Sequence, residues 1–300
     1  MAATKLAEAI RNGRFVVTAE CRPPRGAGTD VYKSCVDALG SVAHAIGAPE
    51  SEDGVRQCSL AACSHLAAAG AEPILHLLTR DLNRIGLQAN ILGAVSMGVH
   101  NVLCLSGRHQ ALTTSGTAKG VFDIDPLQLL QVADAMRKEG RLADGQMLDS
   151  PVELLLGTDT NPFADPTELH VLTLERAAAA GADFVMTQPV FDLDRFEKWM
   201  AAVRQRGIHS KTCIIASVMP LKSAQEAAGL AEKYRSMAIP DEIMAKLSGA
   251  SDQRAVGAEM ATRTIVRLRE IEGVRGVYLM TGDDFDLAAK ILAAGGLSRS

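Results

Sequence analysis

The sequence predicts a (β/α)8 barrel, with residues 1–300 forming one domain. Eight short apolar runs alternate with eight helical patterns along the chain. The runs are continuous rather than alternating, which is typical of parallel strands buried on both faces. Several helical patterns end in glycine directly before the next run, as in "AAAGAE", "RKEG", "AAAAGAD" and "VRQRG", which indicates short helix-to-strand loops. A strand followed by a helix, repeated eight times, is the plan of this barrel.

The expected strands are short runs rich in β-branched and long apolar side chains: 14–21, 42–48, 72–79, 101–107, 153–159, 183–188, 212–219 and 276–281. The first strand must stop soon after residue 21, because Pro23 and Pro24 cannot donate to a sheet ladder. The expected helices are 29–40, 55–70, 83–98, 126–140, 165–181, 192–207, 223–234 with 252–273, and 283–295. Segment 237–252 is expected to be an excursion between the last two strands.

An open doubly wound sheet is the main alternative to the barrel. That fold would need a glycine-rich phosphate turn after its first strand. Here the first strand runs into Arg22, Pro23, Pro24 and Arg25, and no G-x-G-x-x-G opens any helix. The barrel is therefore the better interpretation.

Composition predicts a cytoplasmic protein without a nucleic-acid or membrane partner. The formal net charge of −4 gives no basic surface for nucleic acid. The longest apolar stretch, 91–105, is interrupted by His100 and Asn101, so it falls short of the roughly 18 residues of a membrane span. The first fifteen residues contain an acid and no apolar core, so they do not read as a signal peptide.

The six cysteines predict neither a metal site nor a nucleophile. They include no C-x-x-C pair, and no histidine lies at zinc-ligand spacing from them. Cys21, Cys104 and Cys213 fall in strand segments, where a buried thiol behaves as a small apolar group. A thiol nucleophile would need a positioned base, and the sequence places none beside these residues.

Polar residues stand where the expected strands meet their following loops, which is where the active sites of such barrels lie. Glu20 is the first of them. The alternative to a functional role for Glu20 is a structural salt bridge to Arg22 or Arg25. The others are the acidic segment 48–53, His76, the run from Thr79 to Asp81, 106–110, Asp159, Asn161, Gln188, Met219 with Pro220, and Thr281.

Five segments taken together resemble the methylenetetrahydrofolate reductase family, in its short, catalytic-domain-only bacterial form. They are "VTAECRPPRGAGTD", "PILHLLTRDLNRIGLQANILGA", "VLCLSGRHQ", "VFDIDPLQLLQ" and "FVMTQPVFDLDRFEKWM". The resemblance implies a barrel oxidoreductase of one-carbon metabolism that contains FAD. Hydride would pass from NAD(P)H to FAD and then to the methylene carbon of methylenetetrahydrofolate, a small-molecule folate substrate.

By this resemblance, Glu20 matches a glutamate that serves as general acid, and Gln188 matches a glutamine that hydrogen-bonds the pterin. His76 matches a histidine in contact with the flavin. Each of the last two also has a structural interpretation without a ligand. Gln188 could be an amide that caps the core, and His76 could be a histidine whose hydrogen bonds are satisfied within the protein. Arg108 and Phe191 are further expected substrate-binding residues. The expected cofactor-binding residues are His76, Thr79, Arg80, Arg84, Ser106, Gly107, Arg108, Asp159 and Arg176.

Three departures from the family pattern bear on the flavin. Arg108 stands where the family usually has an aspartate beside the flavin and the pterin. It should make a bound flavin easier to reduce and should weaken stabilisation of the folate cation. Next to Arg176, Ala177 replaces a basic residue expected at the FAD phosphates. The segment after the second strand offers Pro49, Glu50, Glu52 and Asp53 where amides usually contact the ligand.

Phosphate groups need cations or helix N-termini. The candidates that remain are Arg80, Arg84, Arg108, Lys119, Arg176 and the helices that begin near 126 and 165.

Two functions follow from these residues. The first is a methylenetetrahydrofolate reductase, with FAD or with direct transfer of hydride from the nicotinamide. The second is a flavin-less tetrahydrofolate-binding or methyltransferase-linked barrel subunit, which would also use Glu20 to protonate a leaving nitrogen. A scaffolding barrel without an active site is disfavoured by the acid and the amide at strand ends. The sequence leaves open NADH or NADPH, the direction of reaction, and whether the chain forms a homo-oligomer or joins a partner subunit.

Overall fold

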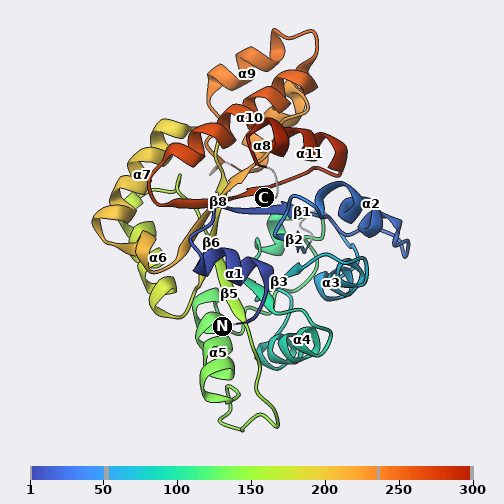
Figure 1. Ribbon diagram of the computed structural model, residues 1–300, viewed down its shortest axis with the longest axis vertical. Coiled ribbons are helices and arrows are strands. Elements are labelled where there is room, and N and C mark those ends of the chain that lie inside the picture. Colours follow the sequence, from blue (N-terminus) through green and yellow to red (C-terminus); the bar gives the residue numbers. More distant parts are fainter. Residues whose placement is uncertain (1, 51–53, 235–236, 298–300) are drawn as a thin grey trace.

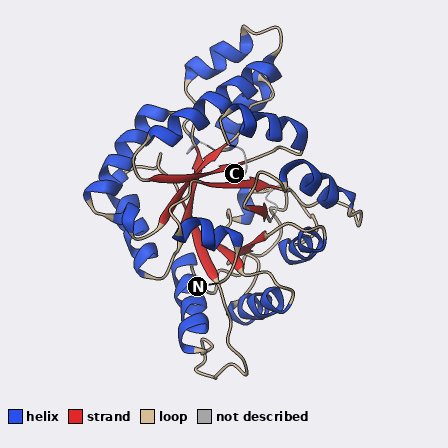
Figure 2. Ribbon diagram, viewed as in Figure 1, coloured by secondary structure: helices blue, strands red, loops and turns tan. Residues whose placement is uncertain are grey.

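Eight parallel strands close into a barrel in chain order, with β8 pairing with β1. The computed structural model describes residues 2–50, 54–234 and 237–297. The barrel and its surrounding helices (Figures 1 and 2) confirm the predicted (β/α)8 fold. The strands are β1 (Val16–Glu20), β2 (Ala45–Ala48), β3 (Pro73–Leu78), β4 (Asn101–Leu105), β5 (Leu155–Thr160), β6 (Phe184–Pro189), β7 (Cys213–Val218) and β8 (Val274–Leu279).

The covering helices begin at residues that cap them. Asn83, Asp125 and Asp192 each accept a hydrogen bond from a backbone N–H of the first turn of the helix that follows, which satisfies a donor that the helix itself leaves free. The helices are α2 (Asp30–Leu39), α3 (Ser59–Ala68), α4 (Arg84–Ser96), α5 (Pro126–Glu139), α6 (Thr167–Ala179), α7 (Leu193–Gln205), α10 (Gln253–Glu270) and α11 (Phe285–Ala294). No helix in the described ranges is long and apolar enough to cross a membrane.

Side chains alternate between two apolar cores along each strand. The core inside the barrel contains Val16, Ile74, Met186 and Tyr278, whereas neighbours such as Val17 pack outward against the helices. Because the side-chain period of a strand is two, Glu20, His76 and Gln188 belong to the inner face. These three polar residues therefore stand above an apolar barrel interior, at its carboxyl end.

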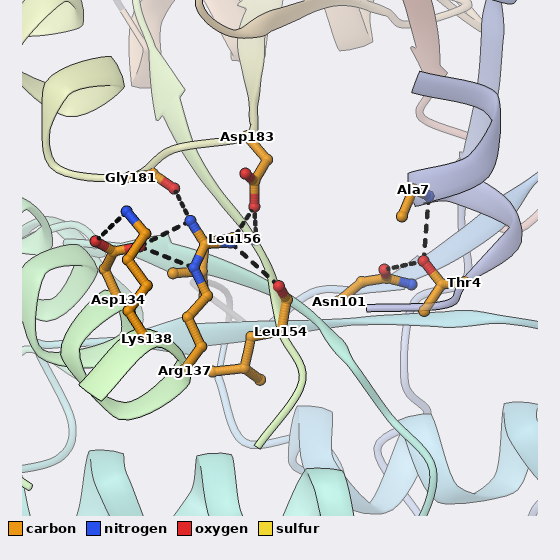
Figure 3. Close-up of polar contacts among 10 residues, drawn as sticks. All are labelled: Thr4, Ala7, Asn101, Asp134, Arg137, Lys138, Leu154, Leu156, Gly181 and Asp183. Carbon is orange, nitrogen blue, oxygen red and sulfur yellow. Dashed lines mark hydrogen bonds and ion pairs between the residues drawn. The ribbon is translucent and has the colours of Figure 1, made fainter. Parts of the chain in front are cut away.

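A helix that the sequence analysis did not predict, α1 (Lys5–Arg11), covers the amino end of the barrel. Leu6 and Ala7 on this helix pack into the inner core. Just before it, the Thr4 hydroxyl accepts from the Ala7 N–H and donates to Asn101 Oδ1 at 3.0 Å (Figure 3). This contact joins the helix to the first residue of β4.

A partly buried arginine connects α5 to the amino ends of two strands. Arg137 pairs with Asp134 on its own helix and with Asp183 just before β6. Its guanidinium also donates to the carbonyl oxygens of Leu154 and Gly181 (Figure 3). The network lies at the end of the barrel opposite the polar strand ends, so it belongs to the fold rather than to the site.

The excursion between β7 and α10 contains two short helices, α8 (Ala224–Lys233) and α9 (Asp241–Ser248). The sequence analysis expected 237–252 as an excursion without assigning the helix within it. A small apolar cluster of Leu221, Ala227 and Leu247 holds the two helices together, and Phe191 packs against that cluster. In Figure 1, α9 lies outside the ring formed by the other helices.

Candidate active site

Unpaired buried polar atoms gather at the carboxyl end of the barrel and in the loop after β4. Buried polar groups in folded proteins normally have hydrogen-bond partners, so such a gathering indicates a ligand site. In the described part of the chain the unpaired atoms at this end are Glu20 Oε1, His76 Nε2, Thr79 Oγ1, Arg108 Nη1, Gln110 Oε1 and the Tyr278 hydroxyl.

Glu20 is the last residue of β1 and is almost completely buried. The backbone N–H of Gly282 is near enough to its carboxylate to favour the charged form, and the Thr281 hydroxyl donates to its backbone carbonyl at 3.1 Å. Burial raises the pKa of Glu20 to about 7, although the positive charge of Arg22 acts in the opposite direction. One carboxylate oxygen has no hydrogen-bond partner in the described structure. A carboxyl group in this state can hold a proton near neutral pH.

The side chains of His76 and Tyr278 meet at Gly47, next to Glu20. Gly47 on β2 is in register with Glu20. A Cβ on Gly47 would lie 2.8 Å from His76 Nε2 and 3.0 Å from the Tyr278 hydroxyl. Burial lowers the pKa of His76 to about 3, so its imidazole is neutral at physiological pH. Only a glycine at position 47 lets both side chains come this close to β2.

Gln188 lies at an irregularity of β6. The register between β6 and β7 shifts between Met186 and Pro189, and such a shift redirects a side chain at the rim of a barrel. Gln188 is half-buried at this irregularity, at the carboxyl end of the strand. Phe191, two residues beyond the strand, is half-buried and packs toward α8 and α9 instead.

Arg108 reaches across the barrel end from the loop after β4 to the end of α8. Its Nη2 donates to the Lys233 carbonyl at 3.0 Å, and its guanidinium carbon lies 4.5 Å from the centre of the Tyr234 ring. The preceding Gly107 has φ +76°, and a Cβ there would crowd Arg80. The exposed Ser106 accepts from the Arg80 N–H through its carbonyl. Arg108 thus joins segments that follow β4 and β7.

Two other expected phosphate ligands are already paired with acids. The Arg80 guanidinium donates to both oxygens of Asp81 at 2.8 and 2.7 Å. Arg84 does the same with Asp123 at 2.8 and 3.0 Å, which lowers the pKa of Asp123 to about 2.

The remaining expected ligands are scattered. Arg176 is exposed on the last turn of α6; because that helix runs antiparallel to β5, this turn lies toward the opposite end of the barrel. Lys119 and Asp159 are exposed, the latter near the end of β5, and Thr79 is buried beside Arg80. The structure therefore gathers Glu20, His76, Thr79, Gln188 and Arg108 near the site, and it leaves Arg176 away from it.

The acidic segment after β2 acts partly as a helix cap. Glu50 Oε1 accepts from the Ser59 N–H at 2.8 Å, at the start of α3. Burial raises the pKa of Glu50. Pro49 is half-buried beside it, while Glu52 and Asp53 lie outside the described residues.

The family model for methylenetetrahydrofolate reductase matches residues 5–296. The chain belongs to the methylenetetrahydrofolate reductase family. This confirms the resemblance drawn from the five sequence segments.

The family includes a curated relative from Caenorhabditis elegans named as a probable methylenetetrahydrofolate reductase (NADPH). It is 26% identical over 254 residues, which cover 83% of this chain and 36% of the relative. The chain thus spans about a third of the length of the curated relative it matches.

Among solved structures, a protein of Clostridium thermocellum titled as binding two copies of 5-methyl-5,6,7,8-tetrahydrofolic acid aligns with a TM-score of 0.70. It shares 12% identity, and the alignment covers 98% of each chain. A 2,3-dimethylmalate lyase aligns with a TM-score of 0.52 and 13% identity, covering 98% of this chain and 83% of that one. At these identities both likenesses concern the fold alone.

Three residues near the site were not predicted from the sequence: Gly47, Tyr278 and Gly282. A glycine inside a strand indicates a close approach of other groups, so Gly47 carried a usable signal. Tyr278 carried none, because a tyrosine in an apolar strand is ordinarily a core residue. Gly282 enters through its N–H, which any residue type other than proline would offer.

Proposed function

We propose that this protein reduces 5,10-methylenetetrahydrofolate to 5-methyltetrahydrofolate, with NAD(P)H as the source of hydride and residues 1–300 acting as one catalytic domain. The observation that carries the proposal is Glu20, a carboxyl buried at the carboxyl end of a family barrel with its pKa raised to about 7. The folate that the C. thermocellum protein is titled as binding is the product of this reaction.

The reaction needs a proton at one nitrogen and a hydride at one carbon. Protonation of N10 of the folate breaks its bond to the methylene carbon, and the bonding electrons stay on N10. The methylene group becomes an iminium on N5, and hydride addition converts it into the N5 methyl group. Glu20 would give the proton to N10 and become a carboxylate, which the Gly282 N–H is placed to stabilise.

Gln188 and His76 would bind rather than react. The Gln188 amide offers one acceptor and two donors, which suits the edge of a pterin that presents both kinds of group. His76 stays neutral because burial lowers its pKa to about 3. It therefore adds no positive charge beside a folate cation.

The residues present fit a flavin ring better than they fit its phosphates. Unpaired buried atoms of His76, Thr79 and Arg108 would hold the ring, whereas Arg80 and Arg84 are paired with aspartates. FAD, when bound, supplies an acceptor for the nicotinamide hydride and a donor to the methylene carbon. Arg108, as a fixed cation, would favour its reduced anionic form.

The test is oxidation of NADH or NADPH that depends on methylenetetrahydrofolate, with the methyl product identified by mass spectrometry. Protein loaded with FAD and protein freed of flavin are assayed side by side, with the visible spectrum recording flavin. Turnover only with FAD supports the flavin route, and turnover in both supports direct hydride transfer. If neither preparation oxidises nicotinamide with this substrate, the reductase proposal fails. Binding of 5-methyltetrahydrofolate by calorimetry would then favour the folate-binding subunit instead.

A further inference from the structure

The part of the barrel interior near Glu20 contains the Tyr278 hydroxyl, a buried polar group to which the proposed reaction gives no role. Glu20 Oε1, His76 Nε2 and the Tyr278 hydroxyl are all buried, and none has a hydrogen-bond partner in the described structure. Leaving a buried polar atom unpaired is costly. Three such atoms in one place call for a common explanation.

The strand register brings the Tyr278 hydroxyl to the level of Glu20. The Tyr278 backbone pairs with Thr18 on β1, two residues before Glu20. Its hydroxyl nevertheless reaches Gly47 on β2, and Gly47 pairs with Glu20. The tyrosine side chain therefore crosses the inner face of β1 and ends beside the acid.

His76 is the neighbour of the Tyr278 hydroxyl on the side of β3. Its ring centre lies 6.3 Å from that of Tyr278, and its Nε2 borders the same point above Gly47. Because this imidazole is neutral, the positive charges that act on Glu20 come from elsewhere. The charged and titratable groups around Glu20 are Arg22 after β1, Arg56 before α3, His76 on β3, Tyr278 on β8, Asp283 after β8, and the thiols of Cys21 and Cys35.

We propose that Tyr278 is a positioning residue for the acid, and that its hydroxyl donates a hydrogen bond to Glu20 Oε1 when the carboxyl group ionises. The Gly282 N–H already favours the ionised form of Glu20. Once the proton leaves, both donors stabilise the carboxylate, so the acid gives up its proton more readily.

Only the catalytic consequence of this inference, a lower kcat in the reductase assay, rests on the proposed function. Its structural part concerns the titration of Glu20 in the protein without substrate. A titration experiment can therefore fail or succeed independently of whether the protein reduces a folate.

The test is Tyr278→Phe, with the titration of Glu20 followed by NMR on protein labelled with 13C-glutamate. The Glu20 resonance is identified by its loss in Glu20→Gln. Removing a donor to the carboxylate should move the midpoint upward by about one pH unit. In the reductase assay, kcat should fall roughly tenfold with the KM for the folate unchanged.

Tyr32→Phe is the matched control, since it removes a hydroxyl that bonds Gln57 Oε1 at 2.7 Å behind the barrel wall. This substitution should leave the titration midpoint of Glu20 unchanged. Gly47→Ala tests the same contact independently, because its methyl group would displace the Tyr278 hydroxyl, and it should raise the midpoint as Tyr278→Phe does. An unchanged or lowered midpoint in Tyr278→Phe, or an equal rise in Tyr32→Phe, would overturn the proposal.

Discussion

At the scale of single residues, the central feature is a carboxyl group that burial keeps from ionising. Glu20 has the positive charges of Arg22 and Arg56 in its surroundings, yet their effect is smaller than that of desolvation. Among the described residues no ion pair joins Glu20 to Arg22. A carboxyl in this state is suited to donate a proton rather than to neutralise an arginine.

Arg108 is predicted to limit the rate of folate reduction. Arg108→Asp replaces a positive charge near the reacting folate with a negative one, which should stabilise the cationic iminium and raise turnover roughly tenfold. Steady-state turnover of methylenetetrahydrofolate checks this expectation. Arg108→Leu is the control, because it also removes the contact with Tyr234 but adds no negative charge. Turnover in Arg108→Asp that equals or falls below wild type would refute this role.

At the scale of elements, the strands could be read from the sequence more easily than the features that close the barrel. Continuous apolar runs located all eight strands to within a few residues. The helix α1 was missed because Lys5–Arg11 spans only seven residues, too few for a helical period to stand out. In the excursion after α8, the helix Asp241–Ser248 was missed for the same reason.

The candidate site was predictable only where it depends on strand ends. Glu20, His76 and Gln188 follow from the rule that barrel sites lie at the carboxyl ends of strands. Tyr278 joins the site because its side chain crosses β1 to Gly47, and this reach depends on three-dimensional register. Arg176 was assigned to the cofactor site only by the family resemblance. The direction of α6 places this residue toward the amino end of the barrel, away from the site.

The amino end of the barrel is predicted to depend on Arg137. Arg137→Met leaves the partly buried carboxylates of Asp134 and Asp183 without their cation, and should lower the free energy of unfolding by about 3 kcal/mol. Urea unfolding measures this change. Arg141→Met, which breaks an exposed pair with Glu139, should cost less than about 1 kcal/mol. Equal effects of the two substitutions would contradict the role given to this network.

At the scale of the whole molecule, the buried acid should make stability depend on pH. The pKa of Glu20 is raised from 4.5 to about 7 by folding. Between these values the folded chain keeps a proton that the unfolded chain releases. The stability that Glu20 contributes is therefore fully present below pH 4.5 and is lost as pH rises through 7.

Glu20→Gln should accordingly be more stable than wild type at pH 8, by up to about 3 kcal/mol, and similar to it at pH 4.5. Urea unfolding of both proteins at the two pH values measures the difference. His76, whose pKa folding lowers to about 3, acts in the opposite direction on acidification. It is present in both proteins and cancels from the comparison. A stability difference that is the same at both pH values would show that Glu20 is not protonated in the fold.

The most direct test of the account separates the two halves of the reaction in Glu20→Gln loaded with FAD. Reduction of the flavin by NADH or NADPH is followed first by stopped-flow absorbance, and methylenetetrahydrofolate is then added to the reduced protein. If Glu20 is the proton donor, the first half keeps nearly its wild-type rate and the folate is not reduced. Loss of both halves would mean that Glu20 is structural, and folate reduction at the wild-type rate would contradict its role as the acid.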